Sequence, residues 1–408
     1  MGTFRSLNHR NYRYYFFGQL ISLIGSWMQM TVLMWLAQID SNESRWPAFI
    51  AVAQIGPTMF LGAVAGSFAD RYPKRTIIVL TQIGFLCCAL CLTILSWVNI
   101  LSVELMVIIM LIHGLFQAID LPARLSFIPD LVSKEDLPNA VALNSLLFNS
   151  ARVIGPALGG ILLLFQGPTI CLLGNSLSYV AVLISLFRMQ NIPSPHQKHQ
   201  KKGGAILGFS ILKQQLDLAL LMLVALFVAV GGWPLMALLP GFVTKVLELK
   251  NSAYSSLVSS VGIGALSAAL LVATLTSNKL RNRLIFLGPI LTTISLFILS
   301  RFTLFPIAIL GCMTFGFGMI LFFSNTQTQI QLETDDKNRG KVMGIWAMVL
   351  SGGVPIGNLI AGPLADIIGI DQVLLIQSSI CLLASIVVSI RWFLLKKRIE
   401  TSNSVIPS

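Results

Sequence analysis

The chain has 408 residues, of which 55% are hydrophobic and 11% charged, and it carries a net charge of +12 at pH 7. Soluble domains contain about 25% charged residues, so this composition excludes an ordinary soluble enzyme and predicts a chain surrounded by a lipid bilayer. The basic excess does not indicate a nucleic-acid partner, because the basic residues lie between apolar runs, where membrane proteins carry their anchors.

Apolar runs long enough to cross a bilayer recur along the whole chain. The basic segment MGTFRSLNHRNYRYY is followed by an apolar run longer than the core of a cleavable signal, so we expect an uncleaved first span. In chain order, the predicted spans are 13–38, 47–69, 76–97, 103–123, 139–165, 169–189, 214–240, 253–276, 283–300, 304–329, 341–365 and 371–394. The sequence therefore predicts an all-α membrane protein with twelve transmembrane helices.

The basic residues between the spans predict how the chain is oriented. With the N-terminus in the cytoplasm, 23 of the 28 Lys and Arg residues fall in cytoplasmic segments and four in external ones. Positively charged loops stay in the cytoplasm, so we expect both termini there. The external loops are short, which leaves no room for an external enzyme or receptor domain.

The spans form two halves of six. Three pairs of glycines repeat at a constant offset of 202 residues: Gly114 and Gly316, Gly155 and Gly357, and Gly160 and Gly362. A repeat of this kind around a central site is typical of transporters. We expect an N-terminal six-helix bundle at 1–190, a cytoplasmic linker at 191–212, a C-terminal six-helix bundle at 213–395 and a cytoplasmic tail at 396–408.

The cysteines and the known catalytic motifs give no sign of enzyme chemistry. All six cysteines lie inside apolar runs, so we expect free thiols and no disulfide. The chain has no GxxxxGK[ST], HExxH or GxSxG motif and no zinc-ligand spacing. We therefore expect no metal, no cofactor and no enzymatic activity, and ATP does not drive the chain directly.

Polar side chains in the predicted spans are informative because they are costly in lipid. The first and fourth spans each carry four polar residues at spacings of three and four, which puts each set on one helix face. Such stripes either hold helices together or line a water-filled cavity that binds a substrate, and the presence of Gln, His, Asp and Arg favours the cavity. The candidate substrate contacts are Gln19, Ser22, Ser26, Gln29, His113, Gln117, Asn149, Arg152, Asn325 and Gln327.

Each charged or titratable residue in the spans has both functional and structural interpretations. Arg152 lies about 20 Å along the fifth span, where it either meets an anionic substrate group, tunes a proton-carrying neighbour or belongs to a structural pair. Asp120 and Arg124, four residues apart, either pair at a helix end or take part in gating. His113 either titrates near neutral pH or only forms a hydrogen bond.

Glycine and proline within the fifth span predict either a bending point or a tight packing seam. The segment ARVIGPALGG at 151–160 contains Gly155 and Pro156. Small residues allow close approach of another helix, and a proline loosens the helix that contains it. Both readings stay open, and Trp233 with Pro234 in the seventh span poses the same choice.

The loop after the second span, GSFADRYPKR at 66–75, resembles the signature that the major facilitator superfamily carries between its second and third helices. This resemblance implies a major facilitator fold of two six-helix pseudo-repeats, complete as a monomer. It implies the role of a cytoplasmic latch for the residues that match the signature: Gly66, Asp70, Arg71, Lys74 and Arg75.

Two longer segments, 8–29 and 120–160, are similar to the branch of that superfamily that contains the enterobactin exporter and macrolide efflux proteins. The similarity implies export of a small amphipathic molecule, siderophore or drug-like, by antiport with protons in the inner membrane of a bacterium. In a departure from the superfamily, Met110 precedes Gly114 where an arginine is common, and Asn278 stands where the first latch loop has Asp70. The predicted spans place no acidic residue at mid-membrane depth, so no proton carrier is visible.

Other functions stay open at this point. A transporter that flips a lysophospholipid or a similar amphiphile would need a lateral opening to lipid. A non-transporting sensor or assembly protein is disfavoured by the polar stripes and the repeat, because a sensor needs no central cavity. Uptake also stays open, since the coupling sets the direction of transport.

Overall fold

The computed structural model describes residues 4–69, 72–190, 215–273 and 277–403. Within these ranges the chain forms helices and no strand. The predicted linker at 191–212 lies outside the described residues.

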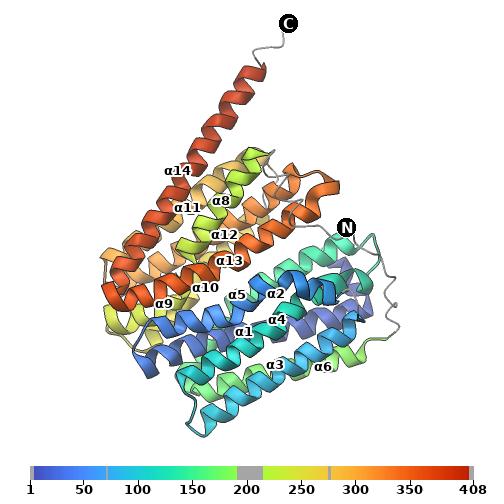
Figure 1. The fold of residues 1–408 in the computed structure, drawn as a ribbon, viewed down its shortest axis with the longest axis vertical. Coiled ribbons are helices and arrows are strands. Elements are labelled where there is room, and N and C mark those ends of the chain that lie inside the picture. The colour runs from blue at the N-terminus through green and yellow to red at the C-terminus, as the bar shows by residue number, and fades with distance from the viewer. Residues whose placement is uncertain (1–3, 70–71, 191–214, 274–276, 404–408) are drawn as a thin grey trace. The chain divides into compact units, whose positions relative to one another are not determined.

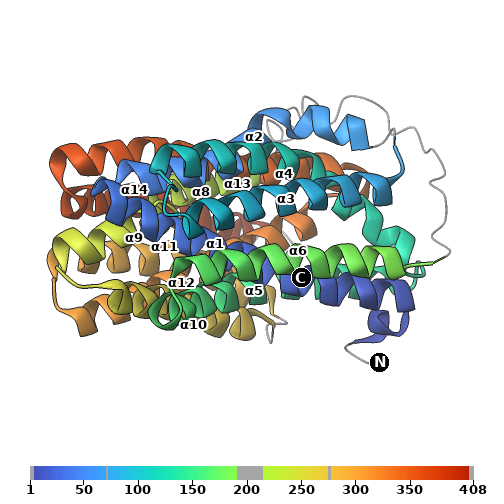
Figure 2. The same cartoon turned by 90° about the horizontal axis from the view of Figure 1, so that it is seen from below.

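Within each half, the helices follow one another along the chain with short connections (Figures 1 and 2). The first half contains η1 (Arg5–Asn8), α1 (Arg10–Ser41), α2 (Arg45–Ala69), α3 (Lys74–Trp97), α4 (Val103–Leu131), α5 (Leu137–Phe165) and α6 (Pro168–Arg188). The second half contains α8 (Leu216–Gly232), α9 (Leu235–Gly241), η2 (Phe242–Val246), α10 (Asn251–Ala273), α11 (Asn278–Arg301), α12 (Phe305–Glu333), α13 (Asp336–Ile368) and α14 (Ile370–Asn403).

The helices correspond to the predicted spans. Eleven stretches of the described residues are long and apolar enough to cross a membrane, and α2 occupies the remaining predicted span at 47–69. Helices satisfy their backbone hydrogen bonds internally, which lipid requires of a spanning segment. The predicted fold class, an all-α membrane protein with twelve spans, is confirmed.

Several helices extend beyond the predicted spans, and two of the differences bear on the site. The fourth span was expected to end at residue 123, whereas α4 continues to Leu131 and contains Pro122 and Pro129. Asp120 therefore lies well inside the helix, about 16 Å from its last residue at a rise of 1.5 Å per residue. In the seventh span, α8 ends at Gly232 and the chain turns at Trp233 and Pro234 before α9 begins. This segment contains a break.

The chain divides into two compact units, which are described separately. Unit 1 comprises Met1–His199 and Met236–Gly262, and unit 2 comprises Gln200–Leu235 and Ile263–Ser408. In unit 1, α1 packs against α5 and α6, and α3 packs against α4 and α6, as Figures 1 and 2 show. In unit 2, α8 packs against α13 and α14, and α11 packs against α12 and α14. The two sets of pairs correspond in chain order, which supports the predicted duplication.

The first part of α10 belongs to unit 1. The Tyr254 ring stacks on Trp35 with 4.9 Å between the ring centroids, and the Tyr254 hydroxyl donates to the Thr31 carbonyl at 3.1 Å. Ser255 Oγ donates to the Gly160 carbonyl of α5 at 3.1 Å. The sequence-based division into bundles at 1–190 and 213–395 stays a prediction.

Candidate functional site

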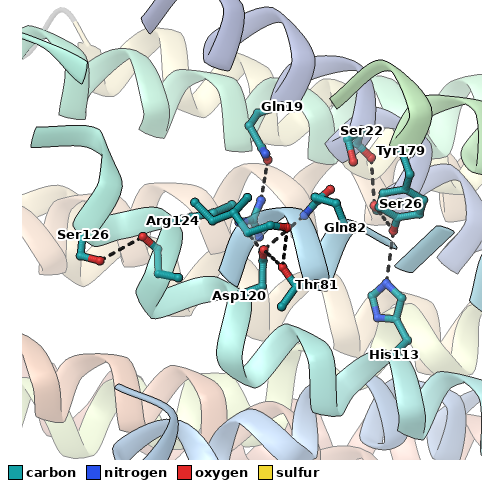
Figure 3. A network of polar contacts seen from close by, with 12 residues as sticks. Gln19, Ser22, Ser26, Thr81, Gln82, His113, Asp120, Arg124, Ser126 and Tyr179 are labelled. Carbon is teal, nitrogen blue, oxygen red and sulfur yellow. Dashed lines mark hydrogen bonds and ion pairs between the residues drawn. The ribbon is translucent and has the colours of Figure 1, made fainter. Parts of the chain in front are cut away.

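The most enclosed charged group in unit 1 is Asp120 on α4, whose side chain has no exposed surface. Its Oδ1 accepts hydrogen bonds from Thr81 Oγ1 at 2.6 Å and from Gln82 Nε2 at 3.2 Å, both on α3. Its Oδ2 lies 2.5 Å from Arg124 Nε, one turn further along α4. Figure 3 shows these four side chains directed towards one another. With Gln19 they are called the Asp120 cluster below.

Gln19 connects the Asp120 cluster to α1. Arg124 Nη1 donates to Gln19 Oε1 at 2.6 Å, so one guanidinium joins α4 to α1 while its Nε meets Asp120 (Figure 3). The predicted i,i+4 pair of Asp120 and Arg124 is present. It lies inside the helix and three helices contribute to it, because α4 is longer than its predicted span.

A second polar contact in unit 1 joins α1, α4 and α6. His113 Nε2 lies 3.2 Å from Tyr179 Oη, and Ser26 Oγ lies 3.0 Å from the same hydroxyl (Figure 3). The His113 ring also stacks on Phe85 of α3, with 4.4 Å between centroids. His113 therefore has the hydrogen-bond partner that one of its two interpretations requires. That partner, Tyr179, was not among the predicted site residues, although the buried polar residues Asn175 and Ser178 stand beside it on α6.

Gln29, a further residue of the α1 stripe, also bonds to other helices. Asn175 Nδ2 of α6 donates to Gln29 Oε1 at 2.7 Å, and Gln29 Nε2 approaches Met110 Sδ of α4 at 3.8 Å. Met110 thus presents a thioether where the superfamily often has an arginine. Ser22 is buried, and its carbonyl accepts from Ser26 Oγ at 2.9 Å. In this structure the stripe holds α1 to α4 and α6.

Arg152 lies over two aromatic rings that contact each other edge to face. Its guanidinium carbon lies 5.3 Å from the ring centre of Trp27 on α1 and 5.3 Å from that of Phe148 on α5. Gly155 brings the helices close enough for this, because a Cβ there would meet Trp27 Cβ at 2.5 Å. Pro156 lies inside α5, which continues to Phe165 without a break. The arrangement combines a cation with two apolar faces.

The other predicted substrate contacts do not join these groups. Gln117 is half-buried on α4, and the side chain of Asn149 lies outside the described residues. In unit 2, Asn325 is buried and donates to the Leu321 carbonyl of its own helix at 2.7 Å. Gln327 is exposed. A central cavity formed by these residues stays a prediction.

The latch motif bonds α3 to its neighbours in unit 1. Lys74 Nζ donates to Asp130 Oδ2 and to the Ser126 carbonyl of α4, each at 2.7 Å. Arg75 donates to the Leu186 carbonyl of α6 at 2.6 Å. Asp70 and Arg71 lie outside the described residues, and Gly66 lies in α2. Sequence reasoning missed Asp130, the acidic partner, although it stands in the quoted segment 120–160.

The connection between α4 and α5 holds a further ionic contact. Asp136, the residue before α5, accepts from His9 Nε2 at 2.7 Å and from Ser133 Oγ at 3.2 Å, and it pairs with Arg5. The hydrogen bond to His9 is the main reason that the pKa of Asp136 lies below its ordinary value, and the charge of Arg5 lowers this pKa further. The segment η1 is thus attached to the start of α5.

Metal-binding groups do not converge in the part of the chain that the structure describes, where no three His, Cys, Asp or Glu side chains come together. The six cysteines are free thiols.

A family model described as a transmembrane secretion effector matches residues 1–406. The staphyloferrin A transporter of Staphylococcus aureus is 25% identical, over 96% of this chain and 98% of its own length. The enterobactin exporter of Escherichia coli O1:K1 is 28% identical, over 87% of this chain and 85% of its own length.

Solved transporter structures share the fold. A bacterial homologue of the human lysosomal transporter Spinster superposes with a TM-score of 0.74 at 14% identity, covering 93% of this chain and 97% of its own. A bacterial homologue of the iron transporter ferroportin gives a TM-score of 0.69 at 15% identity, covering 94% and 98%. At these identities the superpositions show the fold alone.

Proposed function

The chain belongs to the transmembrane secretion effectors of the major facilitator superfamily, and on this premise we propose that it exports a small amphipathic molecule, siderophore or drug-like, by proton antiport. The observation that carries this proposal is the match, over nearly the whole chain, to two transporters named for siderophores. We further propose that it acts as a monomer in a bacterial inner membrane, with both termini in the cytoplasm.

The surroundings of Arg152 support an amphipathic substrate. A guanidinium presents several hydrogen-bond donors to an anionic or strongly accepting group. The rings of Trp27 and Phe148 lie against it and offer apolar faces to the rest of the same molecule. We assign Arg152 the role of a substrate contact, because a cation inside a span is retained where it has a function.

The latch residues support alternating access. Lys74 and Arg75 hold α3 to α4 and α6 within unit 1, so this end of unit 1 moves as one body. In the proposal, Gly66, Asp70 and Arg71 complete the latch in the loop between α2 and α3. Rigid-body movement of one six-helix half against the other is the usual way in which such transporters expose a site to alternate sides.

The test is export from cells that express wild type, Arg152→Ala, Arg301→Ala or the empty vector. Arg301 is the matched control, since it is an exposed arginine at the end of α11. Enterobactin, staphyloferrin A and a fluorescent drug-like dye are the compounds, each measured with and without a protonophore. We expect extrusion that the protonophore abolishes and that Arg152→Ala lowers about ten- to a hundredfold, the effect of losing one charge-assisted hydrogen bond.

Two outcomes would contradict the proposal. Wild-type cells that retain every compound as the empty vector does would refute export of this class, and a lipid-like amphiphile would become the next substrate to test. Normal extrusion by Arg152→Ala at equal expression would make Arg152 a structural residue.

A further inference from the structure

Asp120 is unusual among the carboxylates of the chain. Two carboxylate side chains are buried in the described residues, Asp120 and Asp136. Asp136 precedes α5 and lies outside the spans, whereas Asp120 lies within α4 and has no exposed surface. An ionised carboxylate without water is costly even when it is paired. A carboxylate at such a place therefore needs either lasting compensation or the ability to take up a proton.

The hydroxyl of Thr81 can serve both protonation states of Asp120. Thr81 Oγ1 lies 2.6 Å from Asp120 Oδ1 and 2.9 Å from the Ile78 carbonyl oxygen. A hydroxyl has one hydrogen and can also accept. When Asp120 is ionised, Thr81 donates to it. When Asp120 is protonated, its own O–H donates to Thr81, and Thr81 donates to Ile78.

Gln82 has the same double capacity. Its Nε2 donates to Asp120 Oδ1 at 3.2 Å, whereas its Oε1 is buried and has no donor among the described residues. Turning the amide by half a rotation would exchange the two atoms. The oxygen would then accept a hydrogen bond from a protonated Asp120. Both α3 partners of this carboxylate are thus groups that can donate or accept.

Arg124 is the charged group that faces Asp120, and it is shared. Its Nε meets Asp120 and its Nη1 donates to Gln19 on α1. When Asp120 is neutral, the guanidinium keeps its bond to α1 and loses its counter-charge on α4. Protonation would therefore alter how α4 is held to α1.

Among the described residues, Arg124 is the one charged group that forms a hydrogen bond or ion pair with the Asp120 carboxylate. The charged residue of α5, Arg152, lies over the rings of Trp27 and Phe148. The charged residues of α3 in this region, Lys74 and Arg75, bond to Asp130 and Leu186. On α2, the described side chains at 45–61 include one charge, Arg45, at the first residue of the helix. Groups that feel the charges of the pair from a greater distance are His113 on α4, Tyr15 on α1 and Tyr179 on α6.

We infer that Asp120 is the proton-binding residue of the transport cycle, held by Thr81 and Gln82 in both protonation states and by Arg124 when ionised. This inference rests on the proposed proton antiport. A proton from water forms an O–H bond at Oδ1, the Thr81 hydrogen turns from Asp120 to Ile78, and Arg124 is released towards Gln19. Loss of the proton reverses each change. Thr81, Gln82 and Gln19 are positioning residues.

Infrared difference spectroscopy of the purified full chain in lipid nanodiscs tests the inference without any substrate. Spectra are compared across the pH range in which the protein stays folded, for wild type, Asp120→Asn and Asp371→Asn. Asp371, at the start of α14, is the matched control. We expect wild type and Asp371→Asn to show a carbonyl-stretch band of a buried carboxylic acid that Asp120→Asn lacks. Identical spectra for wild type and Asp120→Asn would overturn the inference.

A second variant tests the arrangement around the carboxyl group. Thr81→Val keeps the shape of the side chain and removes its hydroxyl. Because the carbonyl-stretch frequency depends on hydrogen bonding, we expect the band to persist in Thr81→Val at a shifted frequency. An unshifted band would remove Thr81 from the site. If Asp120→Asn does not fold, the comparison of wild type with Thr81→Val decides. The absence of a carboxylic-acid band from wild type would also refute the inference.

Transport measurements separate this inference from the proposed function. In proteoliposomes loaded with enterobactin, a pH gradient should drive release by wild type, and Asp120→Asn should lose this driving effect while still exchanging labelled for unlabelled enterobactin. Wild type that moves no enterobactin would count against the proposed function, and the Asp120 band would be judged independently. Undiminished gradient-driven release by Asp120→Asn would refute the inference alone.

Discussion

The two units bond their buried polar side chains in different ways. In unit 1 several of them bond to side chains of other helices: Arg124 of α4 to Gln19 of α1, and Asn175 of α6 to Gln29 of α1. In unit 2 they bond largely to the backbone of their own helix, as Asn325 does to the Leu321 carbonyl. The ion pairs described above all lie in unit 1.

The difference indicates a division of labour between the duplicated halves. Charged networks that join helices have two possible arrangements and respond to protonation or to a ligand. Side chains that bond to their own helix leave the helix–helix contacts to packing alone. Unit 1 therefore carries the side-chain network that a change of protonation would alter.

Removing Arg124 should produce the largest loss of stability and is the strongest test of this comparison. Arg124→Met leaves Asp120 buried without its charged partner, which typically costs about 3–5 kcal/mol. In unit 2, Asn325→Leu removes one bond to its own helix and also removes Oδ1, which is buried without a donor among the described residues. We expect a change below about 1 kcal/mol there. Unfolding of the purified variants in detergent measures both.

Two results would contradict these expectations for Arg124→Met and Asn325→Leu. Equal losses for Arg124→Met and Asn325→Leu would show that the two units hold their polar groups equally tightly. A small loss for Arg124→Met alone would show that Asp120 is already neutral in the folded protein.

The α1–α5 contact in unit 1 and the corresponding α8–α13 contact in unit 2 should respond alike to substitution, because both depend on glycine. The difference between the units therefore concerns polar groups. A Cβ at Gly155 would lie 2.7 Å from the Ile24 carbonyl oxygen, and one at Gly357 would lie 2.5 Å from the Val230 carbonyl oxygen of α8. Gly155→Ala and Gly357→Ala should each destabilise by about 1–3 kcal/mol through overpacking. Gly344→Ala is the control, because nothing lies within 4 Å of its Cβ. Clearly different unfolding temperatures for Gly155→Ala and Gly357→Ala would show that this contact is not equivalent in the two units.

These glycines show what sequence reasoning could establish. Hydropathy and charge placed the spans, because lipid imposes length and polarity on every helix that crosses it. The offset of 202 residues paired Gly155 with Gly357, and the structure gives both the same role. A helix–helix contact that occurs once in each repeat leaves a periodic trace in the sequence.

The partners of the site residues leave no such trace. Asp120 and Arg124 were found from their spacing, but Thr81, Gln82 and Tyr179 come from helices far along the chain, within apolar runs. For Thr81 and Gln82, the feature that could have indicated a role was the presence of two adjacent polar residues in the third span. The fourth span was predicted to end at residue 123, whereas α4 continues to Leu131 with Pro122 and Pro129 inside it.

A pair of serines should give a smaller effect that sharpens the comparison. Ser255 Oγ lies 3.1 Å from the Gly160 carbonyl oxygen across helices in unit 1 and 2.9 Å from the Asn251 carbonyl oxygen of its own helix. Ser385 Oγ in unit 2 bonds to the Cys381 carbonyl of its own helix. Both side chains are buried. We expect Ser255→Ala to lower the free energy of unfolding by about 1 kcal/mol and Ser385→Ala by less than about 0.5 kcal/mol. Denaturant titration of the two variants decides between these values, and the reverse order would contradict the comparison.

The smallest effect is expected at Asp136, where unit 1 extends its ionic contacts beyond the spans. His9 and Arg5 hold the pKa of Asp136 below its ordinary value, so the ionised carboxylate stabilises the folded chain at pH values above the pKa of the unfolded state. This contribution is lost as the pH falls through the lowered pKa of the folded state. Melting temperatures of wild type and Asp136→Asn should therefore differ at neutral pH and converge in acid. A difference for Asp136→Asn that persists unchanged in acid would mean that its side chain acts through the shape of the α4–α5 connection, and the charge would then contribute nothing to holding η1 against α5.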